Sequence, residues 1–80
     1  MNIENTLNQG ISILKANKIP NPHLDSETLL SESINKSKRY IILNSKESLN
    51  SEELSSFNSF IARRKKGEPI AYLINKKEFW

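Results

Sequence analysis

The chain has 80 residues, 12 of them Lys or Arg and 9 Asp or Glu, so its formal net charge is a modest +3. A hydrophobic fraction of 36% is enough for one small core and too little for two. The absence of cysteine excludes disulfides, thiolate metal sites and cysteine nucleophiles. The longest apolar run, residues 40–43, is far too short to span a membrane, and no signal-peptide pattern opens the chain. The sequence therefore predicts one soluble, cytoplasmic domain.

The N-terminal segment has the hydrophobic periodicity of a helix. Its apolar residues at intervals of 4, 4 and 3 are Ile3, Leu7, Ile11 and Leu14. We expect Asn2 to cap this helix and Pro20 to end it. Gly10 costs a helix about 1 kcal/mol relative to alanine, so it either lets another helix approach closely or is simply tolerated.

A second helix is predicted to begin at Pro22, with Asn21 as its N-cap residue. Its expected core positions are Leu24, Leu30 and Ile34, with Leu29 alongside. A polar break then precedes residues 39–43, an apolar segment too short for periodicity to distinguish strand from helix. We predict a short helix there, because no neighbouring segment offers a strand to pair with.

The third long helix has the clearest start and end. Asn50 and Glu53 have the spacing of a capping box. Its predicted core positions are Leu54, Phe57 and Ile61. Four cations in the last turn, followed by Gly67, are typical of a helix C-terminus.

The end of the chain changes character. Residues 69–74 are predicted to make one or two helical turns, and residues 76–80 have lost helical periodicity and look extended. The fold class predicted from these elements is all-α, a small antiparallel bundle of about five helices joined by short connections.

Few residues could carry catalysis. His23 is the only histidine, and its position in the first turn of a predicted helix indicates a surface or capping-region residue. No histidine pair has zinc-binding spacing, and the only glycines, Gly10 and Gly67, cannot form a phosphate-binding loop. The acidic pair Glu52 and Glu53 is explained by the start of a helix. The chain by itself is predicted to be inactive, with no metal or cofactor site.

The strongest basic segment is a run of four cations, Arg63, Arg64, Lys65 and Lys66. Such a run can bind phosphates with a salt-dependent affinity, so a stand-alone helical module that binds nucleic acid is the alternative function. Cations at a helix C-terminus also complement its exposed carbonyl groups, and successive residues point about 100° apart and form no single patch. This structural interpretation is favoured, and nucleic acid is not the expected partner.

The sequence ends on two large aromatic residues, Phe79 and Trp80. An exposed aromatic pair at a terminus is costly in water, whereas aromatic side chains are favoured at interfaces. We therefore expect a longer protein or a partner domain rather than folding of these residues back onto the bundle.

Two blocks of the sequence resemble the HemK/PrmC family, the release-factor glutamine methyltransferases. The first block reads Arg-Arg-Lys-Lys-Gly-Glu-Pro-Ile-Ala-Tyr-Leu over residues 63–73 and is followed by Glu-Phe-Trp over residues 78–80. The second block reads Asp-Ser-Glu-Thr-Leu-Leu over residues 25–30 and is less specific. Asn75 stands where the family usually has glycine. The family's Gly-rich S-adenosylmethionine loop and its Asn-Pro-Pro-Tyr motif are not in this chain.

The resemblance implies a helical N-terminal domain over residues 1–74, with residues 75–80 as the start of an extended linker toward a missing α/β catalytic domain. In the family, S-adenosylmethionine is the methyl donor. The acceptor is the Gln of the Gly-Gly-Gln loop in peptide chain release factors, which the helical domain helps to bind and position. A third hypothesis is that the domain chiefly stabilises its own catalytic half.

The resemblance carries no catalytic, cofactor-binding or metal-binding residue onto this chain. It does suggest residues that contact the release factor or the catalytic domain. The candidates for docking onto the catalytic domain are Glu68, Tyr72, Phe79 and Trp80. The candidates that face the release factor are Arg63 and Arg64. A buried structural role for Glu68 or Tyr72 fits the same motif.

Overall fold

A computed structural model describes residues 1–75 of the chain. Within this range the helices are α1 (Ile3–Ala16), α2 (Pro22–Ile34), α3 (Lys38–Leu43), α4 (Ser51–Lys65) and α5 (Ile70–Asn75). The prediction of an all-α bundle of about five helices is confirmed, including the short helix in place of a strand at α3. The extended conformation predicted for residues 76–80 lies outside the described residues.

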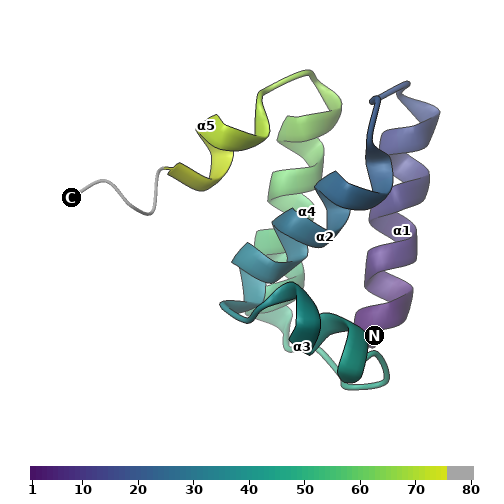
Figure 1. Cartoon of the computed structure of the whole chain (residues 1–80), viewed down its shortest axis with the longest axis vertical. Coiled ribbons are helices and arrows are strands. Elements are labelled where there is room, and N and C mark those ends of the chain that lie inside the picture. Colours follow the sequence, from purple (N-terminus) through teal and green to yellow (C-terminus); the bar gives the residue numbers. More distant parts are fainter. Residues whose placement is uncertain (76–80) are drawn as a thin grey trace.

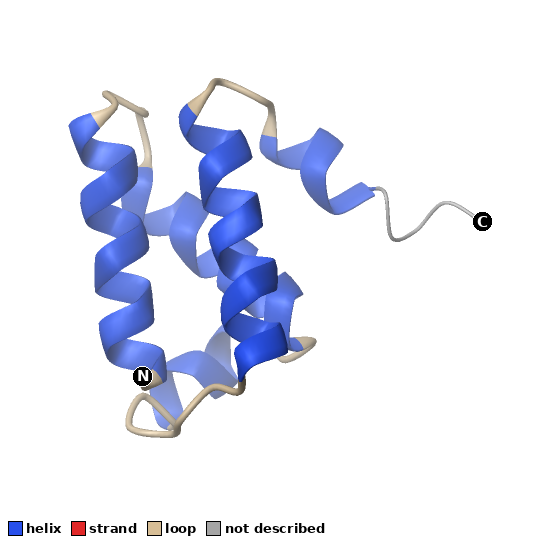
Figure 2. Cartoon of the chain, turned by 180° about the vertical axis from the view of Figure 1, so that it is seen from behind, coloured by secondary structure: helices blue, strands red, loops and turns tan. Residues whose placement is uncertain are grey.

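The three long helices alternate in direction (Figure 1). α1 and α4 lie side by side and run the same way, and α2 crosses them in the opposite sense (Figure 2). α3 closes the end of the bundle near the N-terminus, and α5 packs on α2 and α4 away from α1. The predicted antiparallel order thus holds between consecutive long helices, whereas α1 and α4 are parallel neighbours.

Every helix contributes to one hydrophobic core. The buried hydrophobic side chains within residues 1–75 are Ile3, Leu14, Leu29, Leu30, Ile34, Ile41, Leu49, Phe57, Ile61 and Leu73. The face predicted for α4 is confirmed, with Phe57 and Ile61 buried and Leu54 packed against them. Because α3 and α5 each bury one side chain in this core, both short helices are tied to the bundle.

The buried face of α1 is centred on residues that hydrophobicity does not reveal. Ile3 and Leu14 are buried as predicted, but Ile11 is only half-buried. Thr6 and Gly10 occupy the buried positions between them. The prediction for Ile11 fails because α4 approaches α1 at Gly10, and the next residue along a helix points about 100° away.

Gly10 allows α4 to approach α1 closely. A Cβ atom on Gly10 would lie 2.6 Å from Cζ of Phe57 and 3.2 Å from Cδ1 of Ile61. Real Cβ atoms do not come so close to a ring that is itself packed on all sides. The close-approach interpretation of this glycine is therefore the correct one.

α2 begins where predicted, but two details differ. Asn21 occupies the N-cap position without a side-chain hydrogen bond to the helix. Leu24, expected in the core, is 53% exposed. Leu30 lies six positions further along the helix, a rotation of about 600°, so the two side chains point about 120° apart. Asp25 and Ser26 are buried instead.

The first turn of α1 is held by the segment that precedes α4. The backbone N–H groups of Ile3 and Glu4 donate to the carbonyl oxygens of Glu47 and Ser45, each at 2.9 Å. The side chain of Asn2, the predicted cap, accepts a hydrogen bond from the backbone N–H three residues on. These bonds satisfy the N–H groups that a helix leaves without partners in its first turn, and they fix residues 45–49 against α1.

α4 has the two ends that its sequence predicts. The Asn50 side chain accepts a hydrogen bond from the backbone N–H of Glu53 at 2.7 Å, and the Glu53 carboxylate accepts one from the backbone N–H of Asn50 at 3.0 Å. The capping box is therefore complete. Gly67 follows the last turn with a φ of 102°, a left-handed conformation that favours glycine.

Replacing Gly10 with alanine adds the Cβ atom that Phe57 excludes. We expect the free energy of unfolding to fall by about 1 kcal/mol, because overpacking costs more than the gain in helix propensity returns. Urea unfolding followed by circular dichroism measures the change. Gln9→Ala, at an exposed position of α1, is the control. In a Phe57→Leu background the penalty of Gly10→Ala should shrink, and stabilisation by Gly10→Ala in the native background would contradict close packing.

The two N-cap asparagines make a matched pair. Asn50→Ala removes the side-chain acceptor of the α4 capping box, to which the Glu53 N–H donates, and should lower the free energy of unfolding by about 1 kcal/mol. Asn21→Ala removes no side-chain capping bond, so we expect a change of less than about 0.5 kcal/mol. Equal losses in a urea unfolding experiment would contradict this difference between the two caps.

Candidate functional site

The two sequence blocks at residues 25–30 and 63–73 meet in the folded chain. Nε of Arg64, in the last turn of α4, donates to Oδ2 of Asp25, in the first turn of α2, at 2.9 Å. The two side chains are only 17% and 11% exposed, so the ion pair is largely removed from water. Residues 39 positions apart in the sequence thus join the start of one helix to the end of another.

Arg64 also holds the loop between α4 and α5. Its Nη1 atom donates to the backbone carbonyl oxygen of Glu68 at 2.8 Å. The loop turns at Gly67, whose added Cβ would meet no atom within 4 Å, so the positive φ and not the packing requires glycine there. One guanidinium therefore connects α2, α4 and the loop that leads to α5.

Arg63 closes the same loop through the side chain of Glu68. Nη2 of Arg63 donates to Oε1 of Glu68 at 2.7 Å, and Nε lies 3.1 and 3.2 Å from the two carboxylate oxygens. A planar guanidinium facing a carboxylate makes strong, charge-assisted hydrogen bonds. These bonds to Glu68 raise the pKa of Arg63 above its ordinary value. About a third of each side chain remains exposed.

α5 turns one face to the bundle and the other to solvent. Leu73 is completely buried, and Tyr72 beside it is 59% exposed. The guanidinium carbon of Arg63 lies 6.0 Å from the centroid of the Tyr72 ring. The loop contacts and the burial of Leu73 together fix which side of α5 faces outward. We call the cluster of Asp25, Arg63, Arg64, Glu68 and Tyr72 the α4–α5 corner.

Four of the six candidate residues lie in the α4–α5 corner, namely Arg63, Arg64, Glu68 and Tyr72. The two arginines point into ion pairs within the chain rather than to solvent. Asp25 was missed as a candidate, although it opens the weaker of the two blocks that carried the resemblance. A carboxylate in the first turn of a helix is ordinarily explained by the helix dipole. Nothing in the sequence near Asp25 therefore indicates that it pairs with Arg64.

The other residues singled out in the sequence are His23, Phe79 and Trp80. Phe79 and Trp80 lie outside the described residues. His23 is exposed, as expected, and its Nε2 atom lies 3.4 Å from Oε2 of Glu27. In the part of the chain that the structure describes, no cluster of His, Asp and Glu could hold a metal ion. Among residues 1–75, none of the helices combines the length and the hydrophobicity of a membrane span.

The family model described as the PrmC N-terminal domain matches residues 5–74. The chain belongs to the PrmC N-terminal domain family. No solved structure gives a significant match to it.

Relatives of this PrmC N-terminal domain are longer methyltransferases. The release factor glutamine methyltransferases of Buchnera aphidicola subsp. Schizaphis graminum (strain Sg) and Aliivibrio fischeri (strain ATCC 700601 / ES114) are 42% and 34% identical to it over 80 residues, which is 100% of this chain and 28% of each relative. A bifunctional methyltransferase of Rickettsia bellii (strain RML369-C) is 38% identical over 78 residues, or 98% of this chain and 14% of that protein. The chain spans less than a third of the length of these curated relatives.

Removing the Arg64 charge should destabilise this PrmC N-terminal domain strongly. Arg64→Met leaves the Asp25 carboxylate largely buried without its partner. We expect the free energy of unfolding to fall by about 2 kcal/mol, less than for a fully buried pair because some solvent reaches both side chains. Lys65→Met, at an exposed position of the same turn, should change it by less than about 0.5 kcal/mol.

A double-mutant cycle in urea separates the ion pair from other roles of Arg64. In an Asp25→Asn background, the cost of Arg64→Met should be smaller, because no buried carboxylate is left without a partner. Equal costs of Arg64→Met in the two backgrounds would contradict the coupling between the two side chains.

Proposed function

We propose that the chain is the N-terminal domain of a release factor glutamine methyltransferase and that it helps to bind and position the release factor. The full protein transfers a methyl group from S-adenosylmethionine to the Gln of the Gly-Gly-Gln loop, in the cytoplasm. Residues 1–74 form the helical domain, and residues 75–80 begin the linker to the catalytic domain. The family match and the names of the relatives support this proposal.

The α4–α5 corner is the observation that carries the proposal. Its ion pairs join both sequence blocks and orient α5, the last element that the structure describes. A side-chain amide is a weak nucleophile, so methyl transfer to it depends on holding the acceptor in the right place. A helical domain in which the orientation of α5 is fixed is suited to that task, because it holds a bound release factor at a set distance from the catalytic domain.

The candidate residues take different roles in this proposal. Arg63, Arg64 and Glu68 set the position of α5 through contacts within the chain. Tyr72, exposed on α5, is a docking contact for the catalytic domain, and Phe79 and Trp80 extend the same interface. The proposal leaves the 80-residue chain without methyltransferase activity of its own.

A titration tests the binding role directly. Adding a release factor to the ¹⁵N-labelled chain should shift a contiguous set of amide resonances, with weak and saturable binding. The chain with S-adenosylmethionine alone should transfer no methyl group to the release factor. A spectrum that stays unchanged at high release-factor concentration would remove the binding role, and methylation by the isolated chain would overturn the assignment of activity to the catalytic domain.

Deleting the domain from the full methyltransferase separates positioning from stabilisation. We expect KM for the intact release factor to rise, whereas kcat/KM for a short Gly-Gly-Gln peptide stays unchanged because a peptide makes no contact with the helical domain. If both substrates lose activity equally and the unfolding midpoint of the catalytic domain falls, the domain acts only as a stabiliser.

A further inference from the structure

α3 leaves two large aliphatic side chains in solvent. Ile42 and Leu43 are 65% and 71% exposed, whereas Ile41 in the same helix is 1% exposed. Of the three adjacent aliphatic residues, only Ile41 is buried in the core. Two adjacent exposed aliphatic residues in a domain with so small a core indicate a contact surface rather than a packing requirement.

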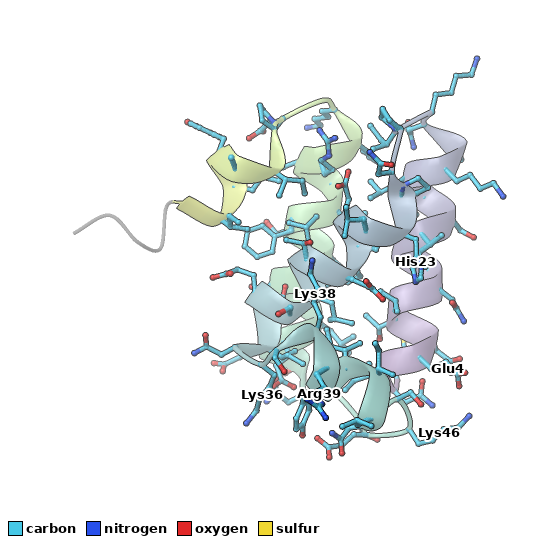
Figure 3. All side chains as sticks on the ribbon, in the orientation of Figure 1. Glu4, His23, Lys36, Lys38, Arg39 and Lys46 are labelled. Atoms are coloured by element: carbon cyan, nitrogen blue, oxygen red, sulfur yellow. The ribbon has the colours of Figure 1, made fainter. Side chains whose placement is uncertain are left out.

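Two cations flank these aliphatic side chains. Lys38 precedes Ile42 by four positions and Arg39 precedes Leu43 by four, so each cation lies one helical turn from an exposed aliphatic residue. Both cations are exposed, and neither takes part in an ion pair among residues 1–75. Figure 3 shows the Lys38 and Arg39 side chains extending from α3, which closes this end of the bundle. We call Lys38, Arg39, Ile42 and Leu43 the α3 surface.

A cleft of about 350 Å³ adjoins the α3 surface. Its apolar wall is formed by Ile3, Leu7, Ile41 and Ile42, and its polar wall includes Glu4, Asn8, Glu27 and Ser45. His23 of α2 also lines it. Interfaces draw most of their binding energy from a few side chains that enter such recesses beside a flatter contact area.

We propose that the α3 surface is the docking site for the release factor, through a patch of the factor that combines acidic and aliphatic side chains. The inference rests on the proposed function, since it names the surface by which the domain holds its partner. The acidic groups pair with Lys38 and Arg39, and aliphatic groups cover Ile42 and Leu43, with one side chain in the cleft. An apolar centre beside complementary charges is the usual composition of a protein–protein interface.

The side chains of α3 favour a protein over a nucleic acid. Proteins that bind single strands stack bases on exposed aromatic rings. Tyr40, the aromatic residue of α3, is half-buried, its hydroxyl donates to the Glu47 carboxylate, and the Lys36 ammonium lies 5.1 Å from its ring centroid. That hydrogen bond raises the pKa of the Tyr40 phenol above its ordinary value. The uncharged exposed groups of the α3 surface are aliphatic rather than aromatic, which suits a protein partner.

The position of the α3 surface favours a second molecule over the catalytic domain. α5, from which the chain continues, packs on α2 and α4, and α3 closes the end of the bundle near the N-terminus (Figure 1). A catalytic domain docked beside Tyr72 would leave Ile42 and Leu43 uncovered. Both interfaces can therefore be occupied at once, as a module that presents one protein to another requires.

Paired charge reversals test this assignment. Lys38→Glu with Arg39→Glu should raise Kd for the release factor about tenfold or more in a titration of the 80-residue chain. Lys65→Glu with Lys66→Glu changes the net charge equally at exposed positions of α4 and its C-cap, and should raise Kd less than threefold. Ile42→Ser with Leu43→Ser should also raise Kd about tenfold. All three variants should keep the helical circular dichroism of the native chain.

Each result separates the inference from the proposed function. If the native chain binds no release factor, both are wrong. If it binds and the α3 variants bind equally well, or the control loses as much affinity as the α3 charge reversal, only the inference is wrong. Binding of the α3 surface to RNA or to anionic vesicles, with none to the release factor, would overturn it in favour of another partner.

Discussion

The ion pair between Asp25 and Arg64 is the contact on which the orientation of α5 depends. α5 has six residues, far fewer than an isolated helix needs to be stable in water. Its position therefore depends on its contacts with the rest of the domain. Leu73 anchors it to the core, and Arg64 fixes the loop before it through the Glu68 carbonyl oxygen. Because Asp25 holds the other side of the same guanidinium, the start of α2 determines where α5 lies.

The four cations at the end of α4 fall into two groups: the arginines make contacts within the chain, and the lysines are exposed. A planar guanidinium matches a carboxylate and has further N–H groups for a carbonyl oxygen, whereas a lysine ammonium is a strongly hydrated point charge. Arg63 and Arg64 accordingly make the contacts within the chain, and Lys65 and Lys66 are exposed. A nucleic-acid site here would have two free cations instead of four, which weakens the alternative function.

Local chemistry was predictable from the sequence, and long-range contacts were not. The caps at Asn2 and Asn50 depend on residues within one turn, so their pattern is visible in the chain. The exposure of Leu24 and the burial of Thr6 depend on which neighbour packs against the helix, which no window of sequence contains. The Asp25–Arg64 pair joins residues 39 positions apart. Only the resemblance to a known family, which includes both sequence blocks, links these two residues before the structure is considered.

The largely buried ion pair between Asp25 and Arg64 is better explained by the orientation that it fixes than by a gain in the free energy of unfolding. Removing two charges from water costs about as much as their attraction returns, and well-packed apolar residues often stabilise a fold equally well. A chain of this size buries only about 60% of its unfolded surface and has little stability to spare. An ion pair in such a small domain is therefore most useful where a direction must be held, since its hydrogen bonds fix angles that apolar contacts leave loose. The direction held here is that of α5, and this supports the proposal that the α4–α5 corner orients a catalytic domain.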